Sequence, residues 1–168
     1  MIWATRGGVA VGIVILVLYL IEWWPGWRAL KKKPLPFVGK LLPFALAWLY
    51  GMLGILTTMG LIGLGFDSAL WAANWLGDVA GWVLAGAQTQ QASRGVYAPL
   101  SGDGVWMVVI FTAVAYGFAR KGPYQRDVRR GVLVGMCLGT SAGIAGLAAV
   151  PVASATNTAG MYLFNWIG

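Results

Sequence analysis

The sequence contains no histidine, one cysteine and few charged residues. Without histidine, the chain lacks the commonest general base and the commonest metal ligand of proteins. Because Cys137 is the only cysteine, an intrachain disulfide is excluded. Charged residues make up 10% of the chain, whereas soluble domains carry about 25%. We therefore expect neither an enzyme nor a metal or cofactor site, and we nominate no catalytic residue.

Apolar residues, in contrast, are abundant. They account for 59% of the 168 positions, and the mean hydropathy is +0.73. The ten Trp and six Tyr residues suit the headgroup level of a bilayer, where amphipathic rings anchor spans. We therefore predict an all-α integral membrane protein that forms a single polytopic domain over residues 1–168.

Four uncharged runs approach or exceed the length that a helix needs to cross a bilayer, which is roughly 20 residues. The predicted spans are about 7–24, 41–66, 104–119 and 131–150. The last run is expected to end at Pro151, because proline cannot continue the helical hydrogen-bond ladder. These spans form two hairpins that share topology rather than visible sequence similarity.

Basic residues collect in the two loops that follow the first and the third predicted span. The positive-inside bias assigns both loops to the cytoplasm, so both termini are expected outside, in a bacterial inner membrane. Each charge near the surface also attracts anionic headgroups by about 1 kcal/mol, so these residues are the predicted contacts for anionic lipid or a partner. No nucleic-acid-binding motif accompanies the charge, so we expect no nucleic-acid partner. The ten residues are Arg28, Lys31, Lys32, Lys33, Lys40, Arg120, Lys121, Arg126, Arg129 and Arg130.

Residues 67–87 form an apolar segment that is interrupted by polar positions. Asp67, Trp71, Asn74 and Asp78 fall on one face of a helix, with apolar residues on the other faces. We predict a helix that lies in the outer interface or re-enters the membrane. If the segment crossed instead, the second basic loop would lie outside, against its five positive charges.

The run 131–150 contains two competing motifs. Its residues 139–143 read GTSAG, a match to the G-x-S-x-G motif of serine hydrolases. Ser141, however, has no histidine to activate it and falls inside a predicted unbroken helix, so we interpret the match as accidental. Glycines at a four-residue spacing predict instead a ridge for close helix packing, either within the chain or against another subunit. The ridge consists of Gly131, Gly135, Gly139 and Gly143.

One acidic residue lies inside an apolar run. Glu22 is placed at the cytoplasmic end of the first predicted span, where Arg28 or a lysine of 31–33 could pair with it. An ion pair is favoured over a proton pathway, because a proton-coupled transporter would need several buried carboxylates. Cys137 is expected to pack as a small apolar residue.

These features favour a non-catalytic structural or accessory subunit of a membrane-embedded assembly, packed through glycine-rich helices. Its expected partners are membrane lipids and either further copies of itself or other membrane subunits. Two alternatives remain open. Small size, few spans and basic loops resemble phage holins, which would imply a homo-oligomeric pore. The last 65 residues resemble the pilin subunits of conjugative secretion systems, with two apolar helices around a basic turn and external ends.

Overall fold

The computed structural model contains six helices and no strand in the residues that it describes, which confirms the all-helical class. The helices are α1 (Arg6–Leu30), α2 (Pro34–Leu56), α3 (Gly60–Ala85), α4 (Gly102–Arg120), α5 (Gln125–Gly139) and α6 (Ile144–Ile167). The structure describes residues 4–31, 34–57, 60–92, 100–120, 124–139, 141 and 144–167, without the side chains of 24–30, 34–38 and 144–147.

Within the residues that the structure describes, three helices are long and apolar enough to cross a membrane, one fewer than the four spans expected. The windows are Arg6–Trp23 in α1, Gly39–Leu56 in α2 and Gly102–Arg120 in α4. The predicted spans 7–24 and 104–119 therefore coincide with α1 and α4. The other two predicted spans do not form continuous helices.

The predicted span 41–66 is divided between two helices. After α2 ends at Leu56, the Thr57 hydroxyl and backbone N–H both donate to the Gly54 carbonyl, at 2.5 and 3.2 Å. Gly60 then begins α3 with a φ of 81°, a conformation that glycine adopts without steric cost. As a result, residues 60–66 join the predicted interfacial segment in one helix.

The predicted helix 131–150 is also divided. α5 ends at Gly139, and the Ser141 hydroxyl and N–H both donate to the Leu138 carbonyl, at 2.8 and 3.1 Å. The expectation that Pro151 ends a helix is wrong, because α6 continues through it. A proline inside a helix has no backbone N–H to donate, so α6 continues past Pro151 with one backbone hydrogen bond fewer. Ser141 therefore lies at a helix break and not inside an unbroken helix.

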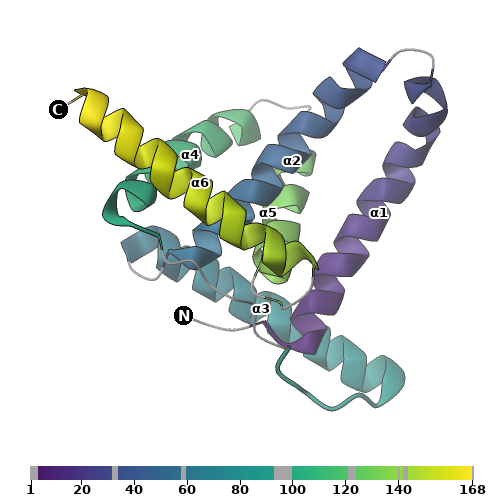
Figure 1. The fold of residues 1–168 in the computed structure, drawn as a ribbon. Helices are drawn as coiled ribbons and strands as arrows, with labels where there is room; N and C mark the ends of the chain where they lie inside the picture. Colours follow the sequence, from purple (N-terminus) through teal and green to yellow (C-terminus); the bar gives the residue numbers. More distant parts are fainter. Residues whose placement is uncertain are drawn as a thin grey trace.

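The helices form two hairpins, each followed by a helix that lies across it. α1 and α2 make the first hairpin and α4 and α5 the second, while α3 and α6 are the crossing helices (Figure 1). α5 lies between α1 and α2 and packs chiefly on α2. Its buried residues are Val128, Gly131, Val134, Gly135, Met136, Cys137, Leu138 and Gly139.

The two halves of the chain repeat the same helix-capping arrangement. In the first half, the side chain of Asn74 in α3 accepts the Thr5 N–H at 3.0 Å, while the Thr5 hydroxyl accepts the Gly8 N–H at 3.1 Å. In the second half, Asn157 in α6 accepts the Ser101 N–H at 2.9 Å, and the Ser101 hydroxyl accepts the N–H of the residue three positions on at 3.1 Å. Each asparagine thus supports the N-terminus of the helix that begins its half.

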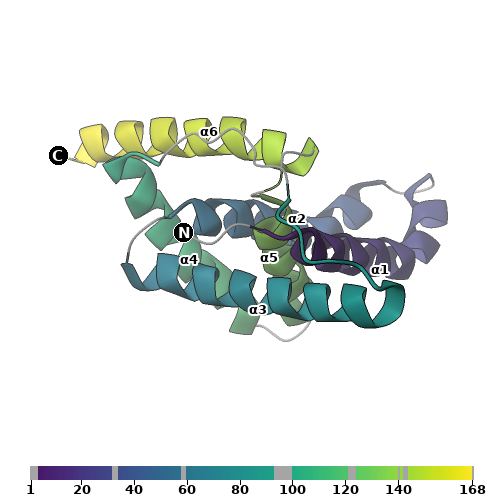
Figure 2. The ribbon, with the colours of Figure 1, turned by 90° about the horizontal axis from the view of Figure 1, so that it is seen from below.

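Further correspondences extend this repeat to the remaining helices. Gly77 lies against the backbone of Gly7 at the start of α1, and Gly160 lies against the backbone of Asp103 at the start of α4. The breaks at Thr57 and Ser141 share the same pair of hydrogen bonds. In Figure 2, α3 and α6 run in opposite directions on opposite sides of α2 and α5. The halves are therefore related by an approximate twofold axis, a stronger relation than the shared topology that the sequence suggested.

Candidate functional site

A close backbone contact between helices forms a seam between α2 and α5. A Cβ atom on Gly135 would overlap the Trp48 carbonyl oxygen and lie 3.0 Å from the Gly51 Cα and the Met52 N. A Cβ atom on Gly51 would in turn overlap the Val132 carbonyl oxygen. Because each glycine faces the backbone of the other helix, the two helices approach to a distance that no side chain would allow.

The other described glycines of the predicted ridge face α2 as well. A Cβ atom on Gly131 would lie 2.5 Å from the Phe44 carbonyl oxygen, and one on Gly139 would lie 3.2 Å from the Met52 Cα. Gly143 lies outside the residues that the structure describes. The described part of the ridge therefore packs within the chain, which was one of the two alternatives left open by the sequence.

An ion-pair cluster ties the far end of α1 to the start of α5. Arg130 donates to both carboxylate oxygens of Glu22, at 2.6 and 3.0 Å, and Arg126 donates to one of them at 2.8 Å. Sequence reasoning expected Glu22 to pair with Arg28 or a lysine of 31–33, but the structure supplies partners from another helix. The side chain of Arg28 and residues 32–33 lie outside the described part of the chain.

The environment of this cluster shifts the pKa values of Asp127 and Arg130. Partial burial raises the pKa of Asp127 above its ordinary value, against the opposing effect of Arg130 and Arg126. The hydrogen bonds to Glu22 raise the pKa of Arg130 above its ordinary value. Within the described ranges, no group of three or more His, Cys, Asp or Glu side chains is placed to hold a metal ion.

The remaining predicted lipid contacts lie on the exposed surface wherever they are described. Lys31, Lys40, Arg120 and Arg129 are exposed, and the Arg120 guanidinium lies 4.9 Å from the centre of the Tyr116 ring. Lys121 falls outside the described residues. The structure therefore joins two of the ten basic residues to Glu22 and leaves these four at the surface.

Ser141 and Cys137, which were singled out in the sequence, both lie in the interior of the structure. Ser141 is 8% exposed, and its hydroxyl donates to the Leu138 carbonyl, a bond that holds the helix end rather than activating a nucleophile. Cys137 is a free cysteine with no exposed surface, packed with Ile55, Phe66 and neighbouring side chains.

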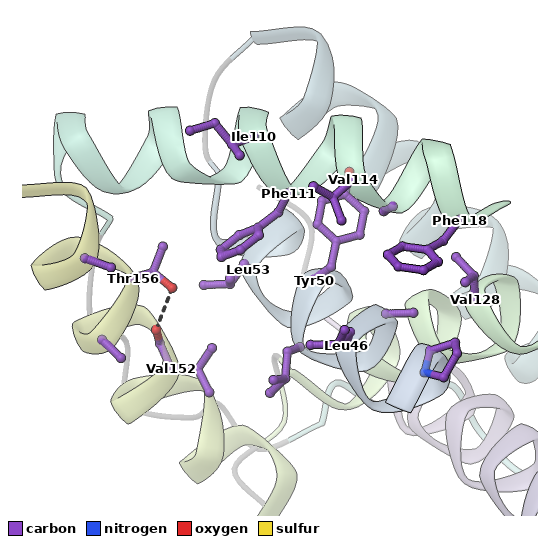
Figure 3. Close-up of a pocket in the computed structure, with 16 residues that line it drawn as sticks. Leu46, Tyr50, Leu53, Ile110, Phe111, Val114, Phe118, Val128, Val152 and Thr156 are labelled. Atoms are coloured by element: carbon purple, nitrogen blue, oxygen red, sulfur yellow. Dashed lines mark hydrogen bonds between the residues drawn. The ribbon is translucent and has the colours of Figure 1, made fainter. Parts of the chain in front are cut away.

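A partly open apolar groove lies between α2, α4 and α6. Its volume is about 470 Å³, within the range of small-molecule sites. Figure 3 shows Tyr50 of α2 and Phe111 of α4 lining it, with Thr156 of α6 at one end and Phe118 at the other. The polar atoms of its lining are already bonded: the Tyr50 hydroxyl to Thr112 at 2.9 Å, and the Thr156 hydroxyl to the Val152 carbonyl at 2.8 Å. The groove therefore offers an apolar surface to a ligand.

Sequence reasoning missed both the groove and the capping asparagines. The groove combines residues from four helices, which periodicity within one helix cannot bring together. The asparagines left a visible signal, because Asn74-x-x-Gly77 recurs as Asn157-x-x-Gly160.

Comparison with known proteins gives no relative: no family model, no curated protein and no solved structure matches the chain.

Proposed function

We propose that the protein is a non-catalytic structural or accessory subunit of a membrane-embedded assembly. The main support is the apolar outer surface of its longest apolar helices. On α1, six large apolar side chains are 45–61% exposed: Ile13, Val14, Val17, Leu18, Leu20 and Ile21. Soluble monomers rarely expose contiguous apolar patches larger than a few hundred Å². Lipid tails or partner subunits would cover such a surface.

The aromatic residues of the two crossing helices support an interfacial position for α3 and α6. Trp71, Trp75 and Trp82 of α3 are 59–69% exposed, and Tyr162 and Trp166 of α6 are 68% and 86% exposed. Exposed rings of this kind gather at the level of lipid headgroups. We infer that both helices lie along the outer interface while the hairpins enter the membrane.

The inferred topology places Gln91 and Gln125 on opposite sides of the membrane. Thr5 pairs with Gln91 at one end of α1, and Glu22 pairs with Arg126 near the other end. At 1.5 Å per residue, Thr5 and Glu22 are roughly 25 Å apart along α1, close to the thickness of the hydrocarbon core. Single cysteines at Gln91 and Gln125, in a Cys137→Ala background, should react with an impermeant maleimide from opposite faces of sealed vesicles. Labelling of both from one face would contradict the topology.

Membership of an assembly is tested by native mass spectrometry of the protein extracted from membranes in mild detergent. We expect particles larger than one chain, and their masses identify copies of this chain or other subunits. If homo-oligomers appear and also release dye from liposomes, the holin-like pore replaces the structural role. If the membrane-extracted protein is a single chain in every mild detergent, the assembly proposal is wrong.

A further inference from the structure

The apolar groove is about as long as one membrane leaflet is deep. Along α2 its lining runs from Pro43 to Leu53, and at 1.5 Å per residue this stretch measures about 15 Å. The hydrocarbon core of a bilayer is about 30 Å thick, so each leaflet contributes about 15 Å. The groove therefore has the length of a single acyl chain within its leaflet.

The internal repeat shows why the groove stays open in one half of the molecule. Aligning the capped starts of α1 and α4 matches Glu22 with Phe118, and aligning Gly51 with Gly135 matches Leu46 with Arg130. In the first half, Glu22 and Arg130 form the ion pair that holds α1 against α5. In the second half, both matched positions are apolar and line the groove. The polar contact of one half is thus replaced by an apolar opening in the other.

Positive charge lies beside one end of the groove. Phe118 and Val128 line this end, as Figure 3 shows. Arg129 follows Val128 directly in the sequence, Arg120 lies two positions after Phe118, and both arginines are exposed. The end of α4 and the start of α5 both lie at this end of the groove, so the cations of both helices are near it. An apolar slot with cations at its mouth complements a molecule that has an apolar tail and an anionic head.

The dimensions argue against a helix of another subunit as the occupant. A helix about 10 Å across with a pitch of 5.4 Å fills roughly 420 Å³ per turn. The groove, at about 470 Å³, would therefore hold little more than one turn.

We propose that the groove binds one acyl chain of an anionic phospholipid, with the phosphate at Arg120 and Arg129. This inference rests on the membrane location proposed above. Tail and head contribute separately. The tail gains close packing against the apolar wall, which offsets the loss of its conformational freedom. Each cation adds about 1 kcal/mol near an anionic surface.

The test uses the detergent-purified full chain, titrated with phosphatidylglycerol or phosphatidylcholine and observed by native mass spectrometry. We expect one phosphatidylglycerol to bind, with phosphatidylcholine weaker. Ala115→Phe fills the groove and should weaken phosphatidylglycerol binding at least about tenfold. Ala113→Phe is the matched control, because Ala113 is an exposed residue of the same helix that does not line the groove. Arg120→Gln and Arg129→Gln should each weaken phosphatidylglycerol binding about fivefold, the equivalent of 1 kcal/mol, without weakening phosphatidylcholine.

Three results would overturn the inference. The first is equal binding by the Ala115→Phe and Ala113→Phe variants, which would exclude the groove as the tail site. The second is an unchanged preference for phosphatidylglycerol in both arginine variants, which would exclude the head site. The third is absence of bound lipid in a protein that carbonate extraction leaves in the membrane, which refutes the lipid site while the proposed membrane role stands. Release by carbonate would instead refute the membrane role itself.

Discussion

Replacing Gly135 by alanine introduces one methyl group into the seam between α2 and α5. That methyl group would overlap the Trp48 carbonyl oxygen and lie 3.0 Å from the Gly51 Cα. Both obstacles are backbone atoms, which cannot rotate away as a side chain does. Carbon atoms make favourable contact at about 3.5–4.0 Å, so the two helices must separate by roughly 0.5–1 Å.

The expected change in the free energy of unfolding follows from two opposing effects. Overpacking in a tight site costs about 1–3 kcal/mol, while alanine favours a helix over glycine by up to about 1 kcal/mol. Gly117→Ala is the matched control, because Gly117 lies inside α4 and an added Cβ would meet nothing within 4 Å. Since both variants share the propensity term, Gly135→Ala should be about 1–3 kcal/mol less stable than Gly117→Ala.

The assay is reversible unfolding in mixed detergent micelles, followed by far-UV circular dichroism, with size-exclusion chromatography of each folded variant. Because Gly51 faces the same contact, the Gly51→Ala and Gly135→Ala losses should be less than additive, since the first separation makes room for the second methyl group. The oligomeric state should not change, since the seam lies within one chain. Equal stability of Gly135→Ala and Gly117→Ala would refute the close contact, and strict additivity would refute a shared seam.

Three further predictions concern the contacts that hold the helices together. Asn74→Ala and Asn157→Ala should each lower the free energy of unfolding by about 1 kcal/mol, because each removes the acceptor at a helix start. Loss at only one of the two positions would contradict the structural repeat. Glu22→Gln should lower the melting temperature slightly and only at low salt, because the ion pair is half exposed and therefore screened; an equal effect in high salt would contradict this. Cys137 should react with N-ethylmaleimide only after unfolding, since it is fully buried, and mass spectrometry of the intact chain reports its labelling.

Sequence patterns located the helices better than they located the breaks between them. The runs that became α1 and α4 follow Arg6 and Asp103, and their starts were predicted within two residues of the observed ones, although α1 extends to Leu30, past its predicted end at 24. The breaks after Leu56 and Gly139 lie inside apolar runs and are made by hydroxyl residues, Thr57 and Ser141. Such residues also occur inside membrane helices, where the hydroxyl bonds back to the preceding turn, so composition alone does not separate the two cases.

The partners of Glu22 illustrate the other limit of sequence reasoning. An acidic residue near the end of an apolar run predicts an ion pair, and basic residues nearby in the chain were the natural choice. The observed partners, Arg126 and Arg130, are 104 and 108 residues away. Only the packing of α5 between α1 and α2 brings them together, and no periodicity within a single helix contains that information.

The seam joins α2 to α5, whereas the groove opens mainly between α2, α4 and α6, so the two features can be altered by different substitutions. Between membrane helices the hydrophobic effect gives little driving force, so close contact and hydrogen bonds must hold them. In the first half, the Glu22 ion pair adds to the glycine contacts and joins α1 to α5. In the second half, α4 is joined to α2 through the Tyr50–Thr112 hydrogen bond, and it packs on α5 and more extensively on α6. Because α4 has the weaker attachment to the central helices, a change in the groove should affect chiefly the second half, whereas a change in the seam should affect both halves.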